Sequence, residues 1–145
     1  MTSRYRYLEE IATADVAFEA WGATREETFL AAADATLNTM VEDIRTVSPR
    51  EGRVFSLAAG SLDLLLFELL QELVYWKDAG RLLLRVRDLR IEEAGSGYRL
   101  HADATGETID PARHPLLADV KAVTLHRLSV EKTPSGWRAV VVLDV

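Results

Sequence analysis

The stretch "IATADVAFEAWG", residues 11–22, decides much of the fold because an aspartate stands where an alternating apolar run begins. From Val16 to Trp21 apolar side chains occupy every second position, which is the period of a strand with one buried face, and a glycine ends the run. Asp15 therefore lies at the start of a strand. The sequence closes on "VVVLDV", in which Asp144 lies near the end of another strand.

Two helices are predicted after this first strand. Thr24 and Glu27 have the spacing of a capping box, in which a hydroxyl and a carboxylate satisfy amides at a helix start, and apolar residues then recur at helical spacing as far as Met40. The second helix covers 61–77, "SLDLLLFELLQELVYWK", and is apolar on nearly all sides. Such a helix is buried on most sides or carries an interface. Asp63, in its first turn, suits the positive end of the helix dipole.

The remaining elements are predicted to be strands, including a short one near 54–57. Segments 81–93 and 97–107 form one antiparallel pair, and segments 114–133 and 136–145 form another across a "PSG" turn. We therefore predict an α+β class, with two helices packed on a mostly antiparallel or mixed β-sheet in a single domain over residues 1–145.

Composition excludes several classes of function. The formal net charge is −6. Because an acidic surface repels phosphate backbones, we do not expect direct binding of nucleic acid. There is no cysteine, so disulfides, thiolate metal sites and cysteine nucleophiles are excluded. No phosphate-binding glycine loop, nucleophile elbow or histidine metal motif is present. The N-terminal residues lack a signal-peptide core and no apolar run approaches the length of a membrane helix, so we expect a cytoplasmic protein without membrane contact.

Five stretches, in their order and spacing, resemble the archease family and together span nearly the whole chain. They are "TADVAFEAWG", "EETFLAAADATLNTM", "LLFELLQELVYW", "VKAVTLH" and the closing "VLDV". The resemblance implies a protein cofactor of the GTP-dependent RNA ligase that joins tRNA exon halves. Such a cofactor promotes guanylylation of the ligase and allows many turnovers. The chain would then activate an enzyme without being one, and it would have no catalytic residues of its own.

The resemblance also implies a divalent metal site formed by Asp15, Asp144 and Val145. The two aspartates are far apart in sequence, so the first and last strands would have to be adjacent. Carboxylates, a backbone oxygen and a chain-terminal carboxylate are hard oxygen ligands that suit Ca²⁺ or Mg²⁺. Zinc is disfavoured because the chain has no cysteine and no clustered histidines. From the residues alone, the simpler interpretation is that each aspartate caps a turn or faces solvent.

Three further residues are secondary candidates. Asp63 is interpreted equally well as a helix N-terminal carboxylate or as a metal ligand. Lys121 matches a lysine that the resemblance marks as functional, although a strand lysine facing solvent is the simpler interpretation. His126 belongs to the same motif but points to the opposite face of a regular strand from Lys121, which favours packing within the strand. The other two histidines, His101 and His114, are interpreted as ordinary surface residues.

Two departures from the family pattern affect this interpretation. Archeases commonly have a histidine where this chain has Ala12, and an aromatic residue where it has Leu125.

Two other classes of function remain open. Asp15 and Asp144 could hold Mg²⁺ in a metal-dependent hydrolase, or the apolar helix over 61–77 could dock a partner in a metal-independent interaction module.

Overall fold

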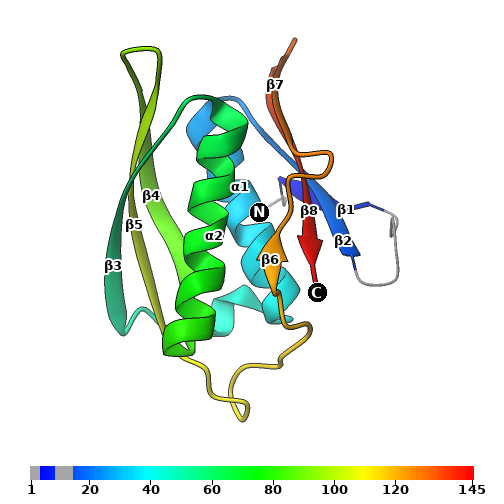
Figure 1. The fold of residues 1–145 in the computed structure, drawn as a ribbon. Helices are drawn as coiled ribbons and strands as arrows, with labels where there is room; N and C mark the ends of the chain where they lie inside the picture. Colours follow the sequence, from blue (N-terminus) through cyan, green and yellow to red (C-terminus); the bar gives the residue numbers. More distant parts are fainter. Residues whose placement is uncertain (1–3, 9–14) are drawn as a thin grey trace.

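The computed structural model describes residues 4–8 and 15–145, in which two helices lie between two β-sheets (Figure 1). The elements follow one another as β1 (Tyr5–Tyr7), β2 (Asp15–Gly22), α1 (Arg25–Met40), the 3₁₀ helix η1 (Ile44–Thr46), β3 (Glu51–Ala59), α2 (Leu62–Gly80), β4 (Leu82–Ala94), β5 (Gly97–Thr108), β6 (Ala122–Val123), β7 (Ser129–Thr133) and β8 (Gly136–Asp144). Both helices contact strands of both sheets.

The strands divide between a five-stranded and a three-stranded sheet. The larger sheet has the order β1-β2-β8-β6, with β7 also paired to β8, and the smaller one has the order β3-β5-β4. The pairs in both sheets are antiparallel. The predicted α+β class is confirmed, whereas the sequence analysis placed the strands in one sheet. Side-chain alternation indicates which face of a strand is buried, but it does not identify the partner strand.

Strands β2 and β8 pair along their whole length. Asp15 is opposite Asp144 at one end of the ladder, and Gly22 is opposite Trp137 at the other. The predicted adjacency of these two strands is confirmed, although β2 is the second strand of the chain because β1 precedes it. Strand β8 has β2 on one side and β6 with β7 on the other, and its residues from Ala139 to Leu143 are all buried.

Helix α1 begins at the predicted capping box. The Glu27 amide donates to Thr24 Oγ1 at 3.1 Å, and the Ala23 amide donates to Glu27 Oε1 at 2.9 Å. One free amide of the first turn, that of Glu27, and the amide of Ala23 just before the cap are thereby satisfied.

Helix α2 lies between the sheets and buries one side of its apolar surface, whereas Leu64 and Tyr75 on the helix remain exposed. Its buried residues are Leu65, Leu66, Leu69, Leu70, Leu73, Val74 and Lys77. The helix continues three residues beyond the predicted end, and Arg81 then adopts the left-handed conformation, with φ 51°. No helix in the described part of the chain is long and apolar enough to cross a membrane.

The prediction of one continuous strand over 114–133 is wrong. This segment contains only the two-residue β6 and the five-residue β7, separated by a turn at His126 and Arg127. Arg127 has φ 57°, a left-handed conformation that interrupts any strand. His126 is exposed in this turn, so its interpretation as a histidine packed within a strand is also wrong.

Candidate functional site

Asp15 and Asp144 lie directly opposite each other at the end of the β2–β8 ladder. Directly opposite residues of an antiparallel pair have Cβ atoms about 4.5–5.5 Å apart and point to the same face of the sheet. Both residues are partly buried, and neither side chain has a hydrogen bond or ion pair with another residue in 4–8 or 15–145. Two like charges are therefore held side by side without a compensating cation from the described chain.

Strand β6 extends this corner of the sheet on the other side of β8. Ala122 lies opposite Asp144, and the Lys121 amide donates to the backbone oxygen of Asp144 at 2.8 Å. The Thr124 amide donates to the backbone oxygen of Val142 at 3.0 Å. The backbone of Lys121 is thus tied to Asp144, and the Lys121 side chain is exposed.

The donors at this corner fit an oxygen-coordinated cation. Thr124 Oγ1 is buried without a hydrogen-bond partner. Thr124 follows β6 directly, and its amide bond to Val142 continues the β6–β8 register, so alternation places its side chain on the face that carries Ala122 and Asp144. Carboxylates together with neutral oxygens are the ligands that Ca²⁺ and Mg²⁺ take in proteins. The predicted ligand Val145 follows β8 directly and packs against the core.

Within the described residues, no three His, Cys, Asp or Glu side chains converge closely enough to hold a metal ion. The predicted set contains only two side chains of these types, Asp15 and Asp144, and adds oxygen from Val145. Cation binding by these three residues therefore stays a prediction.

The secondary candidates do not gather at this corner. Asp63 lies at the start of α2, where its Oδ1 accepts hydrogen bonds from the Ser61 hydroxyl and from the Leu64 amide, the latter at 2.9 Å. His126 lies in the turn between β6 and β7, next to Leu125, whose side chain is 62% exposed. Of these candidates, only Lys121 is joined to Asp144. The other departure from the family pattern, Ala12, lies outside the described residues.

The sequence analysis missed a buried cluster around Glu107 and His114. His114 is fully buried, so its interpretation as a surface residue is wrong. Its Nδ1 accepts the Asp110 amide at 2.8 Å, and Nε2, the remaining N–H donor of the ring, lies 3.0 Å from Glu107 Oε2. Glu107 also accepts the Ser48 amide at 2.7 Å and pairs with Arg113.

The partners of Glu107 determine its ionisation. Burial of the carboxylate acts to raise its pKa, but the Ser48 amide, His114 and Arg113 stabilise the charged form and lower the pKa from 4.5 to about 2. This carboxylate is saturated with donors, which identifies it as a structural group that holds the loops around η1 and residues 110–114 together.

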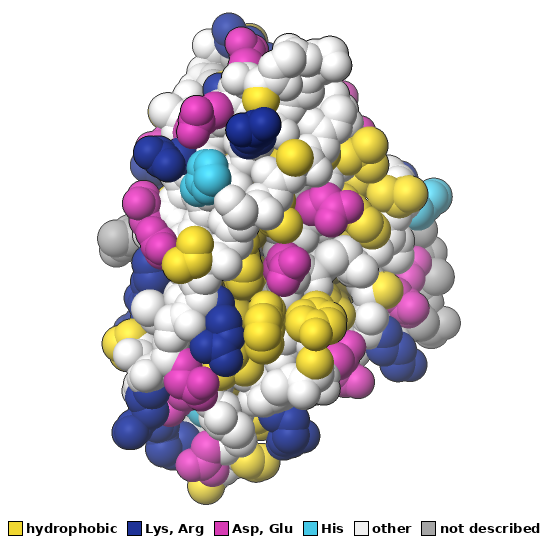
Figure 2. All heavy atoms as spheres, turned by 60° about the vertical axis from the view of Figure 1, so that its left-hand side comes forward, with side chains coloured by type: hydrophobic (Ala, Val, Ile, Leu, Met, Phe, Trp, Pro, Cys, Tyr) yellow, Lys and Arg dark blue, Asp and Glu magenta, His cyan; other side chains and the backbone are white. Residues whose placement is uncertain are grey.

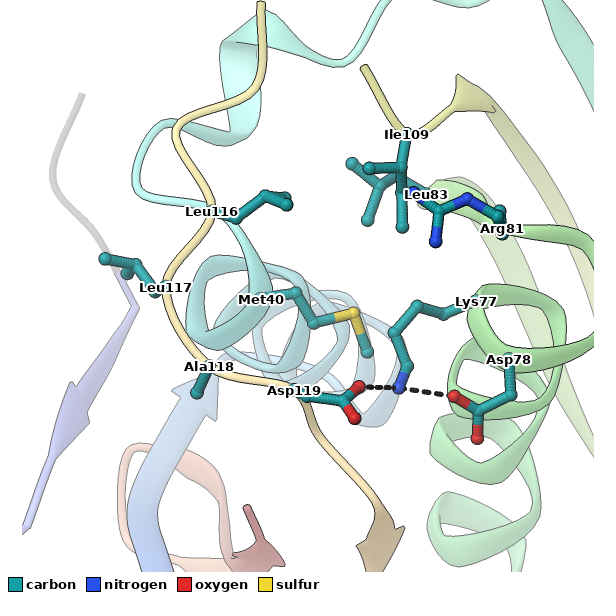
Figure 3. Close-up of a pocket in the computed structure, with 10 residues that line it drawn as sticks. All are labelled: Met40, Lys77, Asp78, Arg81, Leu83, Ile109, Leu116, Leu117, Ala118 and Asp119. Carbon is teal, nitrogen blue, oxygen red and sulfur yellow. Dashed lines mark hydrogen bonds and ion pairs between the residues drawn. The ribbon is translucent and has the colours of Figure 1, made fainter. Parts of the chain in front are cut away.

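A pocket of about 410 Å³ lies where α2 ends, and Lys77 is its buried charge (Figure 3). Lys77 Nζ lies 2.5 Å from Asp78 Oδ1 and also pairs with Asp119. Burial acts to lower the pKa of Lys77, but the two carboxylates outweigh burial and raise it. The pair of Lys77 with Asp119 joins α2 to the segment that leads into Lys121.

The face of the molecule in Figure 2 carries basic and acidic side chains interspersed with hydrophobic ones. A phosphate backbone is bound by basic side chains gathered on one surface. This face does not present such a surface, in agreement with the acidic net charge of −6.

Comparison with known proteins identifies the family. A sequence model of the family described as "Archease protein family (MTH1598/TM1083)" matches residues 5–145. The chain belongs to the archease family. It is 40% identical to protein archease from Thermococcus gammatolerans over 134 residues, covering 92% of this chain and 94% of that protein. It is 39% identical to protein archease from Methanosarcina acetivorans over 145 residues, covering 98% and 96% respectively.

Solved structures of archease relatives share the fold. The solution structure of Methanobacterium thermoautotrophicum protein 1598 matches with a TM-score of 0.84 and 28% identity, covering 99% of this chain and 100% of that one. A crystal structure from Thermotoga maritima, described as an archease and possible chaperone, matches with a TM-score of 0.62 and 20% identity, covering 95% and 97%. The second likeness concerns the fold alone.

Proposed function

We propose that this archease-family chain is a cytoplasmic protein cofactor that activates a GTP-dependent RNA ligase in tRNA splicing or RNA repair. It would promote guanylylation of the ligase and allow multiple turnover, without catalysis of its own. The observation that carries the proposal is the pairing of Asp15 with Asp144, which brings the two aspartates of the family's motifs onto one face of the sheet.

The site would act by presenting a fixed charged surface to the ligase. Strand pairing holds Asp15 and Asp144 opposite each other, and the Lys121 amide ties β6 to the same end of β8. When bound, Ca²⁺ or Mg²⁺ would neutralise the facing carboxylates and join the two strands. Lys121 would add an exposed positive charge at the rim, where a partner protein can contact it.

The direct test is guanylylation of the ligase from the same genome, at limiting ligase and with each variant at equal folded concentration. Wild type should stimulate guanylylation, and Asp144→Asn should abolish the stimulation because a carboxylate of the site is lost. Asp103→Asn is the matched control, since Asp103 is an exposed aspartate of β5 in the other sheet. It should stimulate as the wild type does.

The outcomes separate the proposal from its alternatives. Stimulation that persists in Asp144→Asn and in the presence of a chelator would favour a metal-independent interaction module. Phosphate-ester hydrolysis by the purified chain with Mg²⁺ alone would favour a hydrolase. A wild-type protein that leaves its cognate ligase unchanged would refute the proposed activation.

A further inference from the structure

The Thr124 hydroxyl is an anomaly in this fold. In the described part of the chain, Thr124 Oγ1 is the one buried side-chain oxygen or nitrogen without a hydrogen-bond partner. Buried polar groups in native proteins are nearly always hydrogen-bonded, and an unsatisfied one destabilises the fold. A hydroxyl kept in such a place therefore calls for a partner that residues 4–8 and 15–145 do not supply.

The β6–β8 pairing places this hydroxyl next to the candidate site. Ala122 is opposite Asp144, and Val123 is opposite Leu143. The hydrogen bond from the Thr124 amide to the Val142 oxygen continues the same register by one residue. Thr124 is thus the diagonal neighbour of Asp144 on the same face, and diagonal neighbours have Cα atoms roughly 7–8 Å apart.

This separation suits a shared cation. Two oxygens bound to one Ca²⁺ at about 2.3–2.6 Å each can lie about 5 Å apart, which side chains of diagonal neighbours can reach. The backbone of Thr124 is held against β8 by its own hydrogen bond, so the residue is in place beside Asp144 before any ligand arrives. It adds an oxygen without adding a third negative charge beside Asp15 and Asp144.

We propose that Thr124 is a further oxygen donor of the divalent cation site at Asp15 and Asp144. This inference rests on the cation site of the proposed function. The occupant is a hard divalent cation, and Ca²⁺ is the appropriate probe because its flexible coordination accepts donors from three neighbouring strands.

Thr124→Val tests the assignment because it changes two properties in opposite directions. Valine has nearly the same shape and removes the unsatisfied hydroxyl, so the cation-free protein should melt about 2–6 °C higher than wild type. Its Ca²⁺ affinity, measured by calorimetry, should fall about 10–100-fold, as is usual when a supporting group of a metal site is lost. A merely structural threonine would not combine these effects.

Two further variants control the experiment. Thr124→Ser keeps the hydroxyl and should keep the Ca²⁺ affinity of the wild type within about threefold. Thr46→Val is the matched control, because Thr46 Oγ1 is partly buried and donates to the Asp43 backbone oxygen at 2.7 Å. Its removal should lower the melting temperature and leave Ca²⁺ affinity unchanged. Should Thr124→Val not fold, Thr124→Ala provides the same affinity comparison.

The results distinguish the failure of this inference from that of the proposed site. If wild type binds Ca²⁺ and the variants that lack the hydroxyl bind it equally well, Thr124 is not a donor and the site at Asp15 and Asp144 stands. If wild type takes up no Ca²⁺, the cation site is refuted and the assignment of Thr124 with it.

Discussion

Three carboxylates at strand ends differ in whether hydrogen-bond donors and cations surround them: those of Glu107, Asp15 and Asp144. Glu107 is 5% exposed and accepts an amide hydrogen bond from Ser48, with His114, Arg113 and Arg50 around it. Asp15 and Asp144 face each other, and neither side chain bonds to any residue in the described ranges. The oxygens of Glu107 are occupied by donors from the chain. The oxygens of Asp15 and Asp144 have no such donors in the described ranges and can accept a ligand.

This difference separates a carboxylate whose donors lie within the fold from carboxylates that have oxygens free for a ligand. A carboxylate surrounded by donors stabilises the loops that supply them and has little capacity left for a ligand. Two facing carboxylates without donors destabilise the sheet slightly, because like charges directly opposite each other repel. We therefore expect substitutions at Glu107 to alter stability and substitutions at Asp15 or Asp144 to alter cation binding.

The largest effect is expected for Glu107→Ala. The substitution leaves the fully buried His114 and the Ser48 amide without their acceptor, and such losses destabilise proteins by about 3 kcal/mol. Urea denaturation should show this loss in the free energy of unfolding, while calorimetry should show unchanged Ca²⁺ affinity. Arg50→Ala, which removes an exposed partner 3.3 Å from Glu107, should change stability by less than about 1 kcal/mol. A loss below about 1 kcal/mol for Glu107→Ala would contradict the structural role.

The next effect concerns acid stability. The pKa of Glu107 is lowered from 4.5 to about 2, so the unfolded chain binds a proton at this residue before the folded protein does. The stabilisation that Glu107 provides is therefore fully present above pH 4.5 and is lost as the pH falls towards 2. Unfolding free energies between pH 5 and pH 2 should fall less steeply in Glu107→Gln than in wild type. Identical slopes would exclude the depressed pKa.

A smaller effect of opposite sign is expected for Asp144→Asn without a cation. Removing one of two facing charges should raise the free energy of unfolding by about 0.2–1 kcal/mol. Ca²⁺ should stabilise wild type and leave Asp144→Asn unchanged, which thermal melts with and without Ca²⁺ can measure. The same Ca²⁺-induced shift in both proteins would show that Asp144 is not a ligand.

Local patterns were sufficient to predict most of the helices and hairpins. The Thr24–Glu27 spacing fixed the start of α1, and apolar periodicity with a glycine beyond it bounded α2 to within a few residues. The "AGSG" and "PSG" turns identified the β4–β5 and β7–β8 hairpins. Each of these signals depends on residues that are close together in the sequence.

Contacts between distant segments were not predictable from the residues alone. The pairing of Asp15 with Asp144 was anticipated from the family resemblance, since alternation does not select a partner strand. The burial of His114 depends on Glu107 and on the Asp110 amide, which meet through a turn and show no helical or strand period. Nor does a sequence show that the Thr124 hydroxyl is left unsatisfied, because that depends on every neighbouring strand.

An effect of similar size to that of Asp144→Asn, but destabilising, is expected for Asp63→Asn, whose carboxylate is intermediate between the two kinds. Asp63 accepts the Leu64 amide and the Ser61 hydroxyl at the start of α2, where the helix dipole also favours a negative charge. Asparagine keeps an acceptor oxygen but loses the charge, so the free energy of unfolding should fall by about 0.3–1 kcal/mol. Because the partners of Asp63 lie within α2 and its cap, Ca²⁺ affinity should equal that of wild type. A fall in Ca²⁺ affinity comparable to that of Asp144→Asn would place Asp63 among the cation ligands, and three carboxylates would then have to gather where the fold places two.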